Sequence, residues 1–241
     1  MARNGKEGAN ASYPQYGPWM MDDTELGLVD DVNGKTILEI GCAKGTGLAN
    51  LAARGAGRII GTDISSEQLK YAEQNPMLEK AEFILSPMER DLGEKNFADF
   101  TLSLYSIGYS SDIENTLKLF NQYTKNGRKL ILSWIHPMYS CLSIEDGKVV
   151  MNDSYFNEGP SLALKGEDDI PLIQERFKQS TLIQKLFKAG FAVNDIIETD
   201  PTQEPGMHVG KFYAKNKAHK CPNTLLISAT KFRELDDELA K

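Results

Sequence analysis

Short apolar runs alternate with amphipathic segments along most of this 241-residue chain, and this alternation limits the possible folds more than any other feature. The run 35–41 ends in glycine and is followed by small and apolar residues with helical spacing over 45–54. This pattern predicts a buried strand, a tight turn and a helix. The unit begins again at 58–63, where a second apolar run precedes Ser65, the expected N-cap of another helix.

Three more strands and one helix are expected before residue 136. Strands that alternate with helices at this spacing form a parallel sheet, so the chain is predicted to have an α/β fold. The strands are placed at 81–85, 98–105 and 129–135, and the helix at 113–125.

The segment 136–173 interrupts this alternation, because its glycines, prolines and aromatic residues follow no sustained period. We interpret it as an insertion in a single domain spanning 1–241, with 1–30 as an N-terminal tail and aromatic segment. A helix at 174–189 and strands at 191–198 and 223–229 follow. No helical pattern separates the last two strands, so we expect them to be antiparallel.

Charge and composition exclude several classes of function. The chain has 27 Lys and Arg against 34 Asp and Glu, a net charge of −7 that disfavours binding to duplex nucleic acid. The three cysteines, Cys42, Cys141 and Cys221, have no paired spacing typical of disulfides or zinc sites. No apolar run approaches the roughly 20 residues that span a bilayer, and no signal-peptide pattern is present. We therefore expect a cytoplasmic protein without a metal site.

The turn at 39–47 has the pattern Glu-x-Gly-x-x-x-Gly-x-Gly. Glycines between a strand and a helix let backbone approach a ligand, and the helix start offers free N–H groups. A dinucleotide-binding fingerprint does not fit, because its third glycine would fall on Asn50, or its second on Ala43. A phosphate-binding loop does not fit either, because its first glycine would fall on Val29.

The same turn, with an acid at Asp63 ending the next strand, resembles the first motif of class I S-adenosylmethionine-dependent methyltransferases. The stretches 97–106, 126–132, 186–191 and 221–231 also resemble that family, the last being similar to its small-molecule branch. The resemblance implies a Rossmann-like sheet of strand order 3-2-1-4-5-7-6 with helices on both faces, and S-adenosylmethionine as cofactor. The implied cofactor residues are Glu39, Gly41, Cys42, Ala43, Gly45, Gly47, Asp63, Ile64, Gln68, Ser86, Pro87, Met88, Leu104 and Tyr105.

Several of these residues have alternative roles. Asp63 accepts from the ribose hydroxyls or caps the following helix. Glu39 bonds N–H groups of the turn or the amine of the cofactor. Cys42 is interpreted as a small buried filler rather than a reactive thiol. Ser86 stands where the family often has an acid that contacts adenine.

Substrate-binding residues are expected near the carboxyl edge of the sheet. His136 follows the fifth strand there and is the candidate base, with loop capping as its alternative role. Aromatic residues before the first strand and in the insertion either cover the site or pack on the sheet, and the insertion is the predicted substrate lid. The candidate substrate contacts are Tyr13, Tyr16, Trp19, Tyr139, Tyr155 and His208.

The resemblance implies methyl transfer to an oxygen, nitrogen or carbon atom of a small molecule by direct displacement, in a monomer or homodimer. Two alternatives stay open: a tRNA-base methyltransferase and a non-catalytic S-adenosylmethionine-binding protein. An Asn-Pro-Pro-aromatic motif, typical of amino-group methylation of DNA or protein glutamine, is missing after the fourth strand. The lysines that could form a local RNA-binding patch are Lys211, Lys215, Lys217, Lys220 and Lys231.

Overall fold

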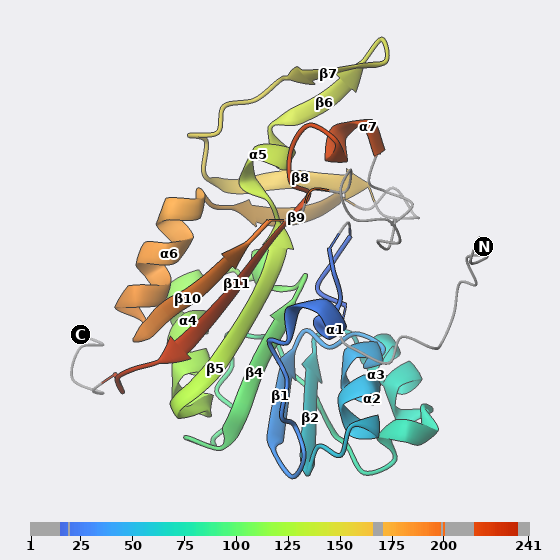
Figure 1. The fold of residues 1–241 in the computed structure, drawn as a ribbon, viewed down its shortest axis with the longest axis vertical. Coiled ribbons are helices and arrows are strands. Elements are labelled where there is room, and N and C mark those ends of the chain that lie inside the picture. The colour runs from blue at the N-terminus through green and yellow to red at the C-terminus, as the bar shows by residue number, and fades with distance from the viewer. Residues whose placement is uncertain (1–14, 19, 166–170, 199, 201–214, 236–241) are drawn as a thin grey trace.

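A computed structural model describes residues 15–18, 20–165, 171–198, 200 and 215–235. At its centre lies a seven-stranded sheet of order β10-β11-β5-β4-β1-β2-β3 (Figure 1). This confirms the predicted strand order. The strands are β1 (Thr36–Ile40), β2 (Arg58–Asp63), β3 (Glu82–Leu85), β4 (Ala98–Leu104), β5 (Thr124–Ile135), β10 (Phe191–Ile197) and β11 (Thr224–Lys231).

The strands β1 to β5 are parallel, whereas β11 runs antiparallel to both of its neighbours, β5 and β10. The antiparallel last pair is therefore confirmed. In the register of β11 and β5, Thr224 lies opposite Ile135 and Thr230 opposite Lys129. The first residues of β11 consequently lie at the edge where the parallel strands end.

Helices cover both faces of the sheet, as expected. In β1, Ile37 packs with helices α2 (Thr46–Ala53) and α3 (Ser66–Glu73), whereas Leu38 belongs to the opposite core. That second core contains α4 (Ile113–Tyr123) and α6 (Gln179–Lys188). Alternate side chains of a strand point to opposite faces, and each fully buried leucine or isoleucine contributes about 1.5–3 kcal/mol.

Helix α4 ends against the last residue of β11. The ammonium of Lys231, 1% exposed, donates to the carbonyls of Asn121 and Thr124, each at 2.9 Å, and to Oδ1 of Asn96 at 2.7 Å. The last carbonyls of a helix have no partner within it, and a cation there is favourable to the helix dipole. Lys231 is therefore a buried cap of α4 and does not belong to a surface patch.

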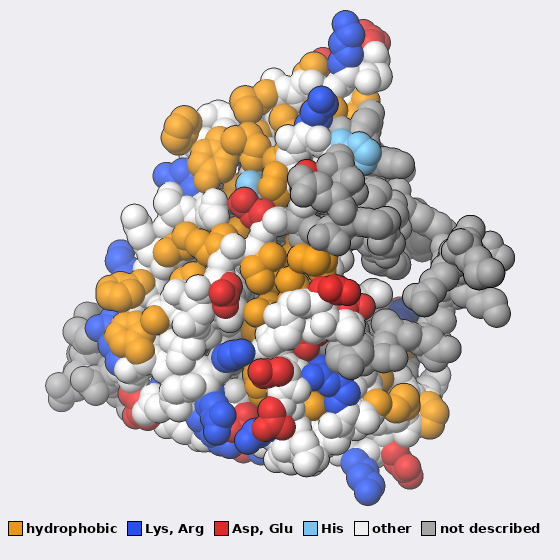
Figure 2. Space-filling view, viewed as in Figure 1, with side chains coloured by type: hydrophobic (Ala, Val, Ile, Leu, Met, Phe, Trp, Pro, Cys, Tyr) orange, Lys and Arg blue, Asp and Glu red, His pale blue; other side chains and the backbone are white. Residues whose placement is uncertain are grey.

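The insertion consists of the short helix α5 (Pro137–Ser140) and two β-hairpins. The expected helix at 174–189 is wrong at its start, because β9 continues to Arg176 and α6 begins at Gln179. Hydrophobic side chains are exposed on the hairpins, in the upper part of the view in Figure 2. They are Ile144, Met151, Leu162, Leu172 and Ile173, and Phe156 is exposed in the segment between the two hairpins. The hairpin strands are β6 (Leu142–Glu145), β7 (Lys148–Met151), β8 (Gly159–Lys165) and β9 (Pro171–Arg176).

Besides α5, the short helical segments of the described residues are α1 (Asp23–Leu26), η1 (Pro76–Leu78), η2 (Ile107–Tyr109) and α7 (Lys215–Ala218). Within the described ranges, none of the helices has the length and apolar character needed to cross a membrane.

Candidate functional site

The turn after β1 forms the floor of the candidate site. Gly41 and Gly45 have positive φ angles, +74° and +68°, and Ala43 between them has φ +47°. A Cβ at Gly41 would lie 2.3 Å from Cβ of Ser106, so no larger residue fits at that position. Tyr105, at the end of β4, also has a positive φ of +56°. Residues with left-handed backbone therefore cluster at the ends of β1 and β4, and such clusters are characteristic of functional sites.

The carboxylate of Asp63 lies at the rim of this turn. One oxygen accepts from the backbone N–H of Ala43 at 2.9 Å, and the other accepts from that of Ser65 at 2.8 Å. These two bonds fix the orientation of a half-buried carboxylate at the end of β2. Ser65 in turn caps α3, because its hydroxyl accepts from the N–H of Gln68 at 3.3 Å, as predicted.

Glu39 lies beneath the turn and is 5% exposed. Its Oε2 is buried without a hydrogen-bond partner. The carboxylate faces the start of α2, where a Cβ at Gly47 would lie 3.4 Å from Oε2. Burial, and to a smaller extent the nearby Asp63, raises the pKa of Glu39 to about 8.

The remaining predicted cofactor residues lie near the ends of β1 to β4, in different environments. Ile64, next to Asp63, is 75% exposed and so offers an apolar surface to a flat ring. Ser86 is buried, and its hydroxyl donates to the carbonyl of Pro87 at 3.1 Å. Cys42 is buried with a raised thiol pKa, in agreement with a filler role. Met88 packs against the core.

Tyr105 closes the site on the β4 side. Its hydroxyl contacts Oγ1 of Thr224 at 2.5 Å and donates to Oδ1 of Asn223 at 3.2 Å. Sequence reasoning missed Asn223 and Thr224, because only the register of β11 brings them to this edge. The ring also packs 5.9 Å from that of Trp134, which in turn lies 5.1 Å from the half-exposed ring of Tyr109.

A strap (residues 15–18 and 20–22) packs over Tyr105. Its ends meet in an antiparallel bridge between Gln15 and Asp22. A Cβ at Gly17 would lie 2.2 Å from the Tyr105 ring, and the carbonyl of Pro18 accepts from the Thr224 hydroxyl at 2.8 Å. The strap therefore lies at the carboxyl edge of the sheet, beside the candidate site.

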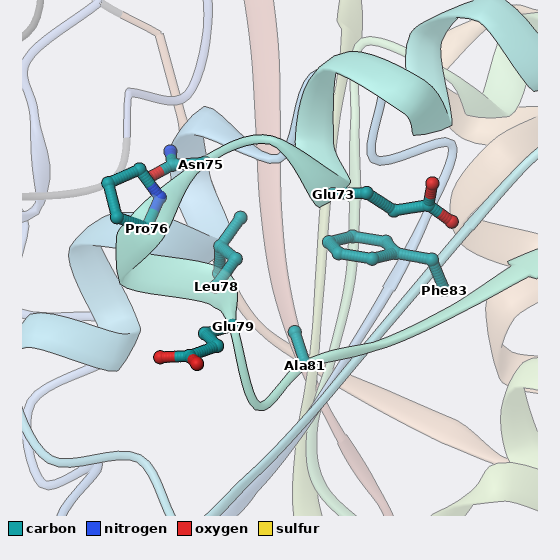
Figure 3. A pocket seen from close by; sticks show the side chains of 7 residues that line it. All are labelled: Glu73, Asn75, Pro76, Leu78, Glu79, Ala81 and Phe83. Carbon is teal, nitrogen blue, oxygen red and sulfur yellow. The ribbon is translucent and has the colours of Figure 1, made fainter.

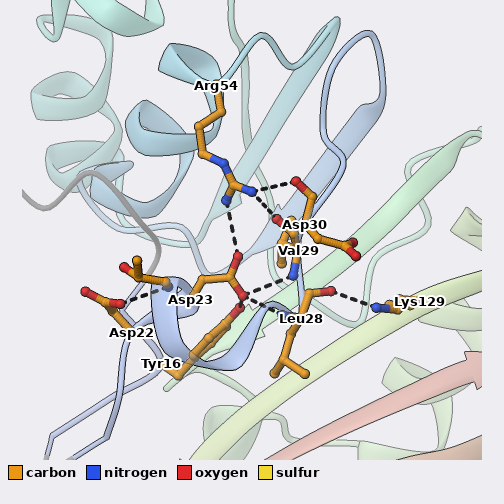
Figure 4. A network of polar contacts seen from close by, with 9 residues as sticks. Tyr16, Asp22, Asp23, Leu28, Val29, Asp30, Arg54 and Lys129 are labelled. Atoms are coloured by element: carbon orange, nitrogen blue, oxygen red, sulfur yellow. Dashed lines mark hydrogen bonds and ion pairs between the residues drawn. The ribbon is translucent and has the colours of Figure 1, made fainter.

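A buried aspartate anchors the strap (Figure 4). Asp23, 3% exposed, accepts from the Tyr16 hydroxyl at 2.5 Å and forms an ion pair with Arg54 at 3.2 Å. It also accepts from the backbone N–H groups of Leu28 and Val29. Tyr16, a predicted substrate contact, is fully buried. Its hydroxyl is bonded to Asp23 inside the protein and does not lie on the surface.

His136 caps α5. Its Nδ1 accepts from the N–H of Met138 at 3.2 Å, and its Nε2 lies 2.8 Å from Oε1 of Glu198. The first bond places the proton of a neutral ring on Nε2, so both ring nitrogens are engaged. This geometry matches the capping alternative, and the base role stays a prediction that these contacts do not favour.

The other predicted substrate contacts lie apart from the turn. Tyr139 is buried under the ammonium of Lys217, which is 3.8 Å from its ring centre. The Tyr155 hydroxyl accepts from the N–H of Gln179 at the start of α6. Tyr13, Trp19 and His208 lie outside the described residues.

A separate hollow of about 320 Å³ lies beside α3, η1 and β3 (Figure 3). None of its lining residues belongs to the turn, to Asp63 or to the strap, so it does not form part of the candidate site. It is lined by Glu73, Asn75, Pro76, Leu78, Glu79, Ala81 and Phe83.

Replacing Ala43 with glycine is expected to raise the free energy of unfolding by about 0.5–1 kcal/mol, because glycine relieves the left-handed strain at the cost of a more flexible unfolded chain. Urea denaturation measures this change. The matched control is Ala52→Gly within α2, which should lower the free energy by about 1 kcal/mol. Equal losses in both variants would show that Ala43 is unstrained.

A family model described as a methyltransferase domain matches residues 37–127, which include the turn and Asp63. A solved structure from Listeria monocytogenes, provisionally assigned as an S-adenosylmethionine-dependent methyltransferase, is 25% identical with a TM-score of 0.72 and covers 87% of this chain and 97% of that chain. Residues 37–127 therefore match a methyltransferase domain, and the fold of the described chain is that of class I S-adenosylmethionine-dependent methyltransferases. The cofactor of the methyltransferases with this fold is S-adenosylmethionine.

Two further proteins are similar to this chain. An S-adenosylmethionine-dependent methyltransferase from Mesorhizobium loti, 20% identical with a TM-score of 0.72 over 86% of this chain and 95% of that chain, shares the fold. A protein of Methanocaldococcus jannaschii provisionally named protein N5-glutamine methyltransferase is 33% identical over 115 residues, which are 45% of this chain and 56% of that protein. The chain thus spans about half the length of the curated relatives it matches.

Proposed function

We propose that this chain transfers the methyl group of S-adenosylmethionine to an oxygen, nitrogen or carbon atom of a small molecule. The main support is the position of the Asp63 carboxylate, which the N–H groups of Ala43 and Ser65 orient at the rim of the glycine turn. Its remaining acceptor capacity suits a ribose diol. The buried, unpartnered Glu39 and the exposed Ile64 fit an amine and an adenine ring on either side.

The reactive group of the cofactor is a methyl on a sulfonium, which a nucleophile takes by direct displacement. This chain's own task is therefore to hold an acceptor in line and to exclude water, and alignment alone supplies much of the rate in such reactions. The strap over Tyr105 and the aromatic cluster with Trp134 and Tyr109 supply walls for an acceptor beside the end of β4. The insertion hairpins are the proposed lid.

The proposed cofactor contact is tested with Asp63→Ala. Removing a hydrogen-bonding carboxylate should weaken S-adenosylmethionine binding roughly 10- to 150-fold, measured by calorimetry. Glu67→Ala is the matched control, because Glu67 is an exposed acid in the first turn of α3. Unchanged affinity in a folded Asp63→Ala protein would contradict the assignment, and absence of binding in the unmodified chain would contradict the proposed function.

The acceptor is sought by turnover of a panel of phenols, amines and quinone precursors, with S-adenosylhomocysteine formation as the readout. A glutamine-containing peptide and tRNA are included as competing acceptors. The tRNA alternative loses support because Lys231 is buried and Lys217 covers Tyr139, so these two lysines do not contribute to a surface patch. Protein glutamine as the acceptor has the Methanocaldococcus relative in its favour. Against it, the sequence after β4 is Leu104-Tyr-Ser-Ile-Gly108, which is not the Asn-Pro-Pro-aromatic motif typical of that reaction.

A further inference from the structure

Glu39 is a buried acid without a counter-ion. It lies in β1 between Gly61 of β2 and Leu102 of β4, and neither neighbour carries a polar side chain. Above it, Gly47 belongs to α2, and the sequence of α2 contains no charged residue. No hydrogen bond to its buried Oε2 is made in the described structure.

The titratable groups that face Glu39 give it no positive partner. Asp63 has the same sign and raises the pKa of Glu39, while Cys42 is held neutral by the burial that raises its own pKa. The loop cation Lys44 is held 5.0 Å above the ring of Tyr71 on α3. The start of α2 favours an anion through its dipole, but its N–H groups form no bond to Oε2.

A buried carboxyl in this situation is more stable with its proton than without it. The amino-acid part of S-adenosylmethionine carries the cation that the protein itself does not provide here. A Cβ at Gly47 would lie 3.4 Å from Oε2, so the glycine keeps this side of the Glu39 carboxylate clear of a side chain.

We infer that Glu39 holds a proton while the site is free and releases it to solvent when S-adenosylmethionine binds, so that its carboxylate then pairs with the ammonium of the ligand. The O–H bond of Glu39 breaks, the electron pair stays on the carboxylate, and one positive charge enters as one proton leaves. This inference rests on the proposed function, because it requires that the cofactor occupies this site.

The inference predicts the number of protons released on binding and the dependence of the affinity on pH. With a pKa of about 8, Glu39 is about nine-tenths protonated at pH 7, so binding should release close to one proton. Because the ligand must displace this proton, its affinity should rise roughly tenfold per pH unit between about pH 6 and 7.5, and it should fall again above about pH 8, where the amine of the ligand loses its charge. In Glu39→Gln, which cannot ionise, the rise should disappear.

The experiment is calorimetry of S-adenosylhomocysteine binding at pH 7 in phosphate and in Tris, whose different ionisation enthalpies report the number of protons released. The unmodified chain should release close to one proton and Glu39→Gln close to none. The ligand's own amine titrates near pH 8, so the difference between these two proteins assigns the proton to Glu39.

A second ligand keeps the test decisive if Glu39→Gln does not fold. 5′-Methylthioadenosine contains the nucleoside and the sulfur but lacks the amino-acid part, and the unmodified chain should bind it without proton release. Equal proton release with both ligands, or with both proteins, would overturn the inference. Failure of the unmodified chain to bind either ligand would instead contradict the proposed function.

Discussion

Replacing Asp23 with alanine is expected to lower the free energy of unfolding by about 3–5 kcal/mol, because it leaves buried partners without their acceptor. The Tyr16 hydroxyl and the N–H groups of Leu28 and Val29 lose their hydrogen bonds, and Arg54 loses its ion pair. Chemical denaturation followed by circular dichroism measures the loss. A protein of ordinary stability would retain only a small margin after this change.

The matched control for Asp23→Ala is Glu25→Ala, an exposed acid in the same short helix, which should change stability by less than about 0.5 kcal/mol. Tyr16→Phe removes one donor alone and should cost about 1 kcal/mol. If Asp23→Ala were no more costly than Glu25→Ala, the network would not anchor the strap.

Replacing Lys231 with methionine is expected to cost about 2–4 kcal/mol, because it leaves two carbonyls at the end of α4 and the Asn96 side chain without a donor. The loss is partly offset, since a charged group no longer has to be buried. Urea denaturation again provides the measurement.

Lys220→Met serves as the control for Lys231→Met, because Lys220 is an exposed lysine of the same C-terminal region. It should leave the midpoint of unfolding nearly unchanged. Equal midpoints for the two variants would show that the buried ammonium contributes nothing to capping α4.

The parallel part of the sheet was predictable because its strands are buried on both faces. Such strands are continuous apolar runs, and glycine marks the turn that follows β1. The hairpins of the insertion were not recognised as strands, because a two-stranded ribbon leaves much of its apolar surface exposed and shows no clear period. One signal was available: Asp146 and Gly147, both with positive φ, form a dipeptide that favours a hairpin turn between β6 and β7.

The candidate cofactor site was predictable where it is local in sequence. The turn and Asp63 lie within 25 residues and are fixed by neighbouring strands. The partners of Tyr105 could not be predicted, because Asn223 and Thr224 reach it only through the register of β11. The buried roles of Asp23 and Lys231 were equally hidden, since charged residues in a sequence are normally interpreted as solvent-exposed.

The bond between Thr224 and Pro18 joins residues 206 positions apart. During synthesis the strap leaves the ribosome early, whereas its partner strand emerges near the end of the described chain. The wall formed by the strap, Tyr105 and β11 therefore cannot be completed until β11 has been made and inserted between β5 and β10. A nascent chain that already contains the glycine turn and Asp63 would carry the cofactor-binding motif without this wall.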